Sequence, residues 1–329
     1  MLCEANYHRS YELTGGKSIL EDKRRKGIIS FLAIAFGLAW LLWEIPIRLG
    51  NFVGTSMFQI IIIPGAFAPA IAAVIVRQWI TREGFADAGF NPGFRKNWRY
   101  YLFALVIPYI VVAAITGLVI LTDLGTPNLS LQDTVSLFQP GTEIDPSVAN
   151  LLWILLPFQF AFNALIATPL LWGEEFGWRS YLQLRLFPGR PLMAAVATGV
   201  IWGVWHYPLN IRGYNYPGHP LLGLIVFPVS CILLSIIFGW LRSRSGSIWT
   251  ASMAHSATNA IGGTFTMFLF LERVDFLYAG YLGLFSWVPL GIIAAWIVLT
   301  GRLKSPVSNS SISNDVPTTA VSNSDNRED

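Results

Sequence analysis

The sequence predicts an all-α, polytopic membrane protein with about eight transmembrane helices around an intramembrane cavity that faces the cytoplasm. Of its 329 residues, 53% are hydrophobic and only 12% are charged, whereas about a quarter of the residues in soluble domains are charged. Apolar runs of the roughly 20 residues that a helix needs to cross the hydrocarbon core recur along most of the chain. Basic residues collect in alternate loops, as expected for a polytopic topology.

The apolar runs define the candidate spans. Their lengths and hydropathy place the boundaries only to within several residues. The eight predicted spans are 27–47, 57–79, 100–122, 149–172, 191–210, 221–241, 248–271 and 276–300.

The distribution of Lys and Arg predicts the orientation. With both termini in the cytoplasm, the tails and cytoplasmic loops hold 19 basic residues and the outer loops hold three. Adding or removing one helix would invert every later loop, so this asymmetry supports the count of eight. We expect a multi-pass protein of the plasma membrane with both termini cytoplasmic.

Three segments follow from these spans. We expect a cytoplasmic N-terminal tail over 1–26, a membrane domain over 27–302 with a motif-bearing core at 149–271, and a C-terminal tail over 303–329. The last segment is rich in Ser, Asn and Asp and poor in apolar residues, which predicts disorder because little apolar surface is available to offset the entropy lost on ordering.

Charge and cysteine content exclude several function classes. The formal net charge is only +3 and the basic residues are dispersed among loops, so we expect no nucleic-acid partner. Cys3 lies in a tail and Cys231 lies in an apolar run. Neither has a partner at the spacing of a zinc site, and a disulfide is not expected.

Glu174, Glu175 and Arg179 follow directly after an apolar run. On an α-helix, Glu175 and Arg179 form an i,i+4 pair in the favourable order, while Glu174 points about 100° away. Glu174 is therefore the uncommitted carboxylate and the candidate general base. On a soluble helix the same pattern is more often a surface ion pair, and juxtamembrane charge is the alternative here.

Two of the four histidines lie within spans, namely His206 and His255. Ionisable groups in a membrane are costly and mark functional sites by default. Asn259 follows His255 by four residues, so on an α-helix the two share a face. The structural alternatives are a hydrogen-bonded His206 packed beside Trp202 and Trp205, and a His255–Asn259 pair that only joins helices.

In their order and spacing, these polar groups resemble the CPBP intramembrane endopeptidases, the family of type II CAAX prenyl proteases of Ras-converting type and abortive-infection-like proteins. The resemblance covers roughly 150–270. The family's second motif usually begins with Phe, where this chain has Trp. The three matching motifs are E-E-x-x-x-R at Glu174, Glu175 and Arg179, aromatic-x-x-x-His at Trp202 and His206, and H-x-x-x-N at His255 and Asn259.

The resemblance implies hydrolysis of a peptide bond inside the membrane. Glu174 and His206 then activate a water molecule, while His255 and Asn259 stabilise the tetrahedral oxyanion, a contribution of several kcal/mol in a low-dielectric site. The implied partners are the lipid bilayer and a membrane-associated protein or peptide, either CAAX-like or a bacteriocin leader.

The remaining motif residues have supporting roles in this reading. Glu175 and Arg179 hold the end of their helix in place, and Trp202 shapes the pocket. Helix geometry adds a requirement: His206 lies roughly 24 Å along its helix from its cytoplasmic end, at 1.5 Å per residue. Glu174 must reach this depth, either because the fourth helix continues past Arg179 or because the fifth begins well outside the bilayer.

A metal-dependent mechanism is the second reading of the site. Glu174, His206 and His255 have the ligand types of a catalytic zinc centre with three protein ligands. The chain has no H-E-x-x-H helix, and an Asn at position 259 suits an oxyanion better than a soft metal. We therefore favour a glutamate-activated water without a cofactor.

Two other classes of membrane protein would also account for polar residues buried in the spans. A transporter would use Glu, His and Asn as a proton or ion relay, although no inverted repeat is evident in the sequence. A membrane scaffold or immunity protein would retain the fold without activity. Neither the substrate nor the cleavage rule follows from the residues.

Overall fold

The computed structural model describes residues 2–50, 56–138, 140–270 and 274–303. Within these ranges all regular elements are helical, which confirms the all-α prediction. Six helical segments of the described chain are long and apolar enough to cross a membrane: Leu20–Arg48, Ile63–Ile80, Phe94–Leu121, Pro146–Arg185, Pro220–Ser245 and Phe276–Leu299.

The other two predicted spans are helical but less typical of membrane crossings. Pro191–Trp205 is apolar but has only 15 residues, and the segment that begins at Ile248 is helical through Phe270 but contains Ser, Thr, His and Asn. The protein is therefore a polytopic helical membrane protein, and the count of eight spans stays a prediction.

The helices have the following bounds. They are α1 (Leu2–Arg48), α2 (Ser56–Ile61), α3 (Ile63–Ala66), α4 (Ala68–Ile75), η1 (Val76–Ile80), α5 (Phe94–Leu121), α6 (Leu131–Phe138), α7 (Pro146–Gly177), η2 (Trp178–Leu182), α8 (Gln183–Arg185), α9 (Pro191–Trp205), α10 (Tyr207–Asn210), α11 (Pro220–Ser245), α12 (Ile248–Ala257), η3 (Thr258–Phe265), α13 (Thr266–Phe270), α14 (Phe276–Ala279), η4 (Leu284–Ser286) and α15 (Trp287–Leu299).

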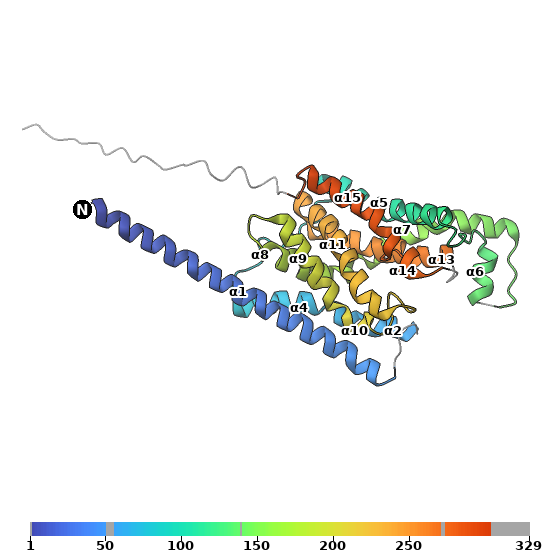
Figure 1. Ribbon diagram of the computed structural model, residues 1–329, viewed down its shortest axis with the longest axis horizontal. Helices are drawn as coiled ribbons and strands as arrows, with labels where there is room; N and C mark the ends of the chain where they lie inside the picture. Colours follow the sequence, from blue (N-terminus) through green and yellow to red (C-terminus); the bar gives the residue numbers. More distant parts are fainter. Residues whose placement is uncertain (1, 51–55, 139, 271–273, 304–329) are drawn as a thin grey trace, which may run out of the picture.

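Helix α1 lies along one side of the bundle, against α4, and its N-terminal part extends beyond the other helices (Figure 1). The predicted tail 1–26 is therefore helical from Leu2 onward and continuous with the first span. Helices α5 and α15 lie on the opposite side (Figure 1). The predicted disorder of the C-terminal tail concerns residues 304–329, which lie outside the described part of the chain.

Helices α9 and α11 pack at close range through glycines. A Cβ atom on Gly199 would lie 2.5 Å from the backbone Cα of Ile232, and one on Gly203 would lie 2.6 Å from Cα of Pro228. Small residues spaced by four let helix backbones approach each other in membrane proteins. This contact fixes the helix that carries Trp202 and leads into His206.

Glycines also allow α7 to pack closely against α4. A Cβ on Gly173 would lie 2.8 Å from the ring of Phe67, and one on Gly177 would lie 2.3 Å from Cβ of Pro69. Gly173 and Gly177 flank Glu174 and Glu175 in sequence, so the turn of α7 that carries both glutamates has little freedom to move.

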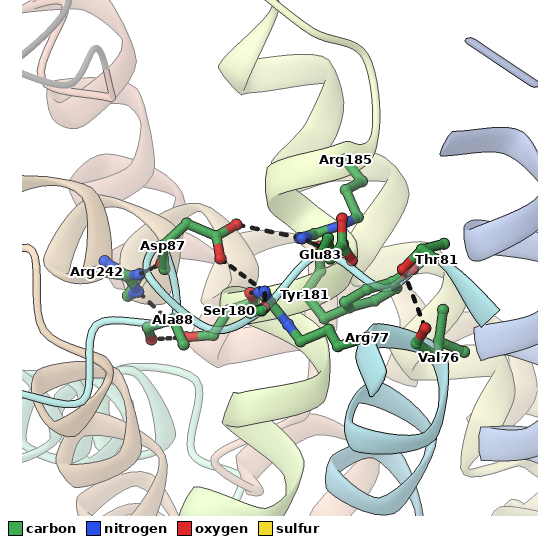
Figure 2. A network of polar contacts seen from close by, with 11 residues as sticks. Val76, Arg77, Thr81, Glu83, Asp87, Ala88, Ser180, Tyr181, Arg185 and Arg242 are labelled. Atoms are coloured by element: carbon green, nitrogen blue, oxygen red, sulfur yellow. Dashed lines mark hydrogen bonds and ion pairs between the residues drawn. The ribbon is translucent and has the colours of Figure 1, made fainter. Parts of the chain in front are cut away.

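The loop 81–93 is bound to the ends of three helices by a buried polar network (Figure 2). The fully buried Arg77 donates to the carbonyl of Gly84 at 2.6 Å, to Oδ1 of Asp87 at 2.7 Å and to the carbonyl of Ser180 in η2 at 2.7 Å. These bonds tie the loop to the π-helical turn that follows the two glutamates.

Helix α11 joins the same network. Arg242 donates to the backbone carbonyl of Asp87 at 2.6 Å and to Oγ of Ser180 at 3.3 Å, and that hydroxyl donates in turn to the carbonyl of Ala88 at 2.7 Å. Arg185 adds an ion pair with Asp87 at 3.2 Å (Figure 2). The loop therefore braces η2 against α11.

Candidate active site

Glu174 and Glu175 lie near the end of α7, inside a helix that continues well past them. Helix α7 passes into η2 and α8 without a break, and the apolar segment runs from Pro146 to Arg185. Of the two ways to bring Glu174 to the depth of the histidines, continuation of the fourth helix past Arg179 is confirmed. Glu174 is only 5% exposed and Glu175 is fully buried.

Glu175 and Arg179 form the predicted i,i+4 pair, with Nη1 of Arg179 donating to Oε1 of Glu175 at 2.8 Å. Both side chains are fully buried. The pair is therefore an internal ion pair and not a surface ion pair. A buried charge of this kind tolerates loss of its partner poorly.

The guanidinium of Arg179 is also covered by two aromatic rings. Its Cζ lies 4.4 Å from the ring centroid of Trp202 and 5.1 Å from that of Phe238. Among the described residues, Nε and Nη2 of Arg179 have no hydrogen-bond acceptor, so these ring faces are the other stabilising contacts of the charge.

Glu174 points away from the ion pair, as helix geometry predicted. Its Oε2 accepts a hydrogen bond from Nε1 of Trp202 at 2.8 Å. The same indole packs edge to face against both histidines, with ring centroids 5.9 Å from His206 and 5.1 Å from His255. Trp202 is therefore the side chain that brings Glu174 and the two histidines together.

His206 lies directly after α9, at the point where the helix ends. Its Nδ1 lies 2.9 Å from the carbonyl oxygen of Trp202. Since a carbonyl only accepts, Nδ1 donates, and Nε2 of the neutral ring keeps its lone pair. Trp205 and Phe227 pack on the ring with centroids 4.7 and 4.9 Å away, and the side chain stays partly exposed.

His255 lies on α12 and is 4% exposed. Its Nδ1 lies 2.9 Å from Oε1 of Glu175, the oxygen that also accepts from Arg179. In this arrangement Nδ1 donates to the carboxylate, so Nε2 carries a proton only when the ring is cationic. The sequence assigned Glu175 only to the support of its own helix, and the link to α12 was not predicted.

Asn259 does not share the buried environment of His255. The α-helix gives way to the π-helical turn η3 at Thr258, so the i,i+4 geometry expected from the sequence is interrupted between the two residues. The side chain of Asn259 is exposed and makes no hydrogen bond to another described residue. Single π-turns inside α-helices occur often at functional sites.

Tyr214 is a further polar group near Glu174 that the sequence analysis missed. It lies in the segment after α10, where its ring packs 5.8 Å from that of Phe58. Burial and the nearby charge of Glu174 raise the pKa of the Tyr214 hydroxyl to about 12, so the phenol keeps its proton at neutral pH. A tyrosine in a loop carries no spacing signal that would have identified it.

The side chains do not fit the zinc centre considered as the second reading. No group of three or more His, Cys, Asp and Glu side chains placed to share a metal ion occurs in the part of the chain that the structure describes. The indole of Trp202 lies against Glu174, His206 and His255.

The comparison with known families covers the core of the chain. Residues 149–261 match the family described as type II CAAX prenyl endopeptidase, Rce1-like. No curated protein matches the chain. The matched range contains all seven motif residues and thus confirms the resemblance that they indicated. The core of the chain, residues 149–261, is therefore similar to the Rce1-like family of type II CAAX prenyl endopeptidases.

Proposed function

We propose that the protein is an intramembrane endopeptidase that hydrolyses a peptide bond of a membrane-associated protein or peptide, with Glu174 and His206 activating the water. The observation that carries the proposal is the contact of one indole, that of Trp202, with Glu174, His206 and His255. One carboxylate and two imidazoles that contact the same buried indole supply the groups that acyl-transfer chemistry needs.

In the proposed reaction, the Glu174 carboxylate takes a proton from water as the water oxygen attacks the substrate carbonyl carbon. Nδ1 of His206 is occupied by the carbonyl of Trp202. The lone pair on Nε2 is therefore free to accept a hydrogen bond from the same water and to help orient it. Collapse of the tetrahedral intermediate breaks the C–N bond, and the proton returns to the leaving amine. The products are a new carboxylate and a new amino terminus.

His255 and Asn259 are proposed to stabilise the oxyanion of that intermediate. His255 donates from Nε2 only as an imidazolium, whose Nδ1–H is accepted by the carboxylate of Glu175 that also pairs with Arg179. The exposed amide of Asn259 is not engaged by another described residue, so it is available to a substrate carbonyl. Preorganised donors of this kind contribute about 3–4 kcal/mol each to transition-state stabilisation.

The proposed substrate is a CAAX-like or leader-like segment that reaches the site from the membrane. The family name supports a CAAX-type substrate, and the apolar helices place the protein in the bilayer where such a segment is anchored. We propose the plasma membrane, with both termini and the catalytic cavity facing the cytoplasm. The proposed mechanism uses no cofactor.

The test compares new peptide termini in membranes of cells that express wild type, Glu174→Gln or Glu143→Gln at matched levels. Glu143 is an exposed glutamate in the segment before α7 and serves as the control. Termini that require Glu174 but not Glu143 would support the protease and name its substrates. Identical termini in all three samples would contradict it and favour the transporter or the inactive scaffold.

A further inference from the structure

A cavity of about 510 Å³ lies away from the candidate site, between the ends of α5, α11 and α15. Three basic and five aromatic side chains line it, and none of its lining residues is acidic. The basic side chains are Lys96 and Arg99 at the start of α5 and Arg302 just after α15. The cavity therefore combines concentrated positive charge with apolar walls.

The three cations have no counter-charge among the described residues. Lys96, Arg99 and Arg302 take part in no ion pair there, whereas Arg77 and Arg185, in the neighbouring network of Figure 2, both pair with Asp87. Repulsion among uncompensated like charges is unfavourable unless an anion relieves it.

The position of Lys96 on α5 adds to that cost. The first turn of α5 contains no acidic residue and instead carries basic ones. Basic side chains at a helix N-terminus oppose the helix dipole, which favours negative charge there. An anion bound beside Lys96 and Arg99 would relieve the repulsion among the cations and would also interact favourably with the N-terminal end of the helix dipole.

Trp240 contributes a buried ring to the wall of the cavity. Trp240 is 2% exposed, and its Nε1 has no acceptor among the described residues. Buried indole N–H groups usually have a partner. The rings of Trp240 and Trp296 lie 5.6 Å apart, and the guanidinium of Arg302 lies 4.4 Å from the ring centroid of Trp296.

An exposed apolar stripe leads from the cavity along α5. Trp98, Leu102, Val106 and Ile110 are spaced by four residues and are 38–54% exposed. Residues at this spacing share one face of a helix. The stripe thus runs from the charged cavity along a membrane-crossing helix, which matches a ligand with a charged head and an apolar tail.

We propose that this cavity binds the phosphate headgroup of an anionic membrane lipid, with its acyl chains along the stripe Trp98–Leu102–Val106–Ile110. Lys96, Arg99 and Arg302 contact the phosphate. The predicted orientation places the cavity at the cytoplasmic leaflet, where basic pockets between transmembrane helices bind anionic headgroups. The site is separate from the proposed peptidase centre.

The test uses the full-length chain in detergent, titrated with phosphatidylglycerol or with phosphatidylcholine of the same acyl chains, with bound lipid counted by native mass spectrometry. The expected result is a preference for phosphatidylglycerol that weakens as salt rises. The double variant Lys96→Gln/Arg302→Gln should bind it about 25-fold more weakly, at roughly fivefold per basic residue.

Two further variants sharpen the result. Arg95→Gln removes an exposed charge next to Lys96 that does not line the cavity and should change binding no more than about twofold. Trp240→Phe keeps a ring in the cavity wall and removes only a buried N–H, so it should change binding no more than about twofold. Circular dichroism checks that each variant is folded.

Several outcomes would overturn the proposal. Equal affinity for the two lipids, or an unchanged affinity in the folded double variant, would remove the headgroup site. Inorganic phosphate that binds as tightly as phosphatidylglycerol would overturn the lipid assignment and leave a site for free anions. The inactive Glu174→Gln variant should bind the lipid as wild type does, so failure of the proposed peptidase would not affect this result.

Discussion

Oε1 of Glu175 lies 2.9 Å from Nδ1 of His255 and joins the end of α7 to α12. The same oxygen accepts from Arg179 at 2.8 Å, so one carboxylate holds a cation on its own helix and an imidazole on another. Glu175 therefore orients His255 toward the site, in addition to anchoring the helix end.

This shared carboxylate predicts a large effect of Glu175→Gln. The substitution leaves Arg179 as a buried charge without a counter-ion, which costs about 3–5 kcal/mol of the free energy of unfolding. It also removes the acceptor that fixes Nδ1–H of His255, so cleavage should fall together with stability. Unfolding in detergent micelles, followed by tryptophan fluorescence, measures the first effect.

The double variant Glu175→Gln/Arg179→Met serves as the control for charge. Removing both ions should restore part of the stability that Glu175→Gln loses, because no unpaired buried charge remains. Cleavage should stay low in the double variant, since His255 still lacks its carboxylate. A double variant that is less stable than the single one would contradict the ion-pair interpretation.

Trp202→Phe separates the hydrogen bond to Glu174 from ring packing. Phenylalanine retains an aromatic ring beside both histidines but lacks the N–H that donates to Oε2 of Glu174 at 2.8 Å. We expect a loss of about 1.5–3 kcal/mol in stability, typical of a hydrogen bond to a charged group, and a lower kcat. Trp79→Phe, at a ring that is 63% exposed, is the control. An unchanged kcat would make the indole N–H dispensable.

The fold class could be predicted from the sequence because hydropathy and charge act over whole spans. Runs of apolar residues need no knowledge of tertiary contacts to indicate membrane helices. The exact number of transmembrane spans is harder to predict. The helix that begins at Ile248 carries the polar residues of the site, and α9 stops at Trp205 where His206 begins the break.

The site residues were identified from spacing, and one of their contacts followed from it. The Glu175–Arg179 bond is local to one helix, so the i,i+4 rule predicted it. The Trp202–Glu174 and Glu175–His255 bonds join helices and depend on packing that no local pattern contains. Asn259 was expected to share a helix face with His255. A π-helical turn begins at Thr258 and replaces the α-helical geometry that this expectation assumed.

Gly199→Ala tests the close approach of α9 and α11. A Cβ at this position would lie 2.5 Å from backbone Cα of Ile232, and backbone cannot move aside as a flexible side chain can. Overpacking of this kind costs about 1–3 kcal/mol. Unfolding in micelles measures stability, and cleavage should fall because α9 carries Trp202 and leads into His206.

Gly117→Ala is the matched control on α5. A Cβ on Gly117 meets no atom within 4 Å, so only helix propensity changes, with an expected gain of about 0.5–1 kcal/mol. Equal effects of the two substitutions would show that helix propensity rather than close packing decides the cost at Gly199.

Asp87 makes the stability of the loop 81–93 depend on pH. Burial raises the pKa of this carboxyl, but the hydrogen bond and charge of Arg77 and the charge of Arg185 outweigh it and hold the pKa below its usual value near 4. A depressed pKa contributes stability above the unfolded value, and this contribution disappears as the pH falls through the folded pKa.

Asp87→Asn should therefore destabilise the protein at pH 6, and the difference from wild type should shrink as the pH falls below about 4. Thermal unfolding in micelles between pH 6 and pH 3 measures this difference. Asp123→Asn, on an exposed aspartate after α5, should give a difference that does not depend on pH. A constant difference for Asp87→Asn would show that its charge is not what stabilises the loop.

Chelation distinguishes the two readings of the catalytic centre. In a glutamate mechanism, Glu174 and the two histidines act directly on water and substrate, so exhaustive treatment with a zinc chelator should leave the cleavage rate within about twofold of the untreated enzyme. A zinc mechanism predicts loss of cleavage that zinc restores, with zinc bound beside Trp202, which contacts all three of these residues. Trp202 fluorescence, isolated by comparison with Trp202→Phe, provides a readout besides activity: addition of zinc should leave it unchanged if the indole stays hydrogen-bonded to Glu174. A zinc-dependent change together with restored cleavage would overturn the metal-free mechanism.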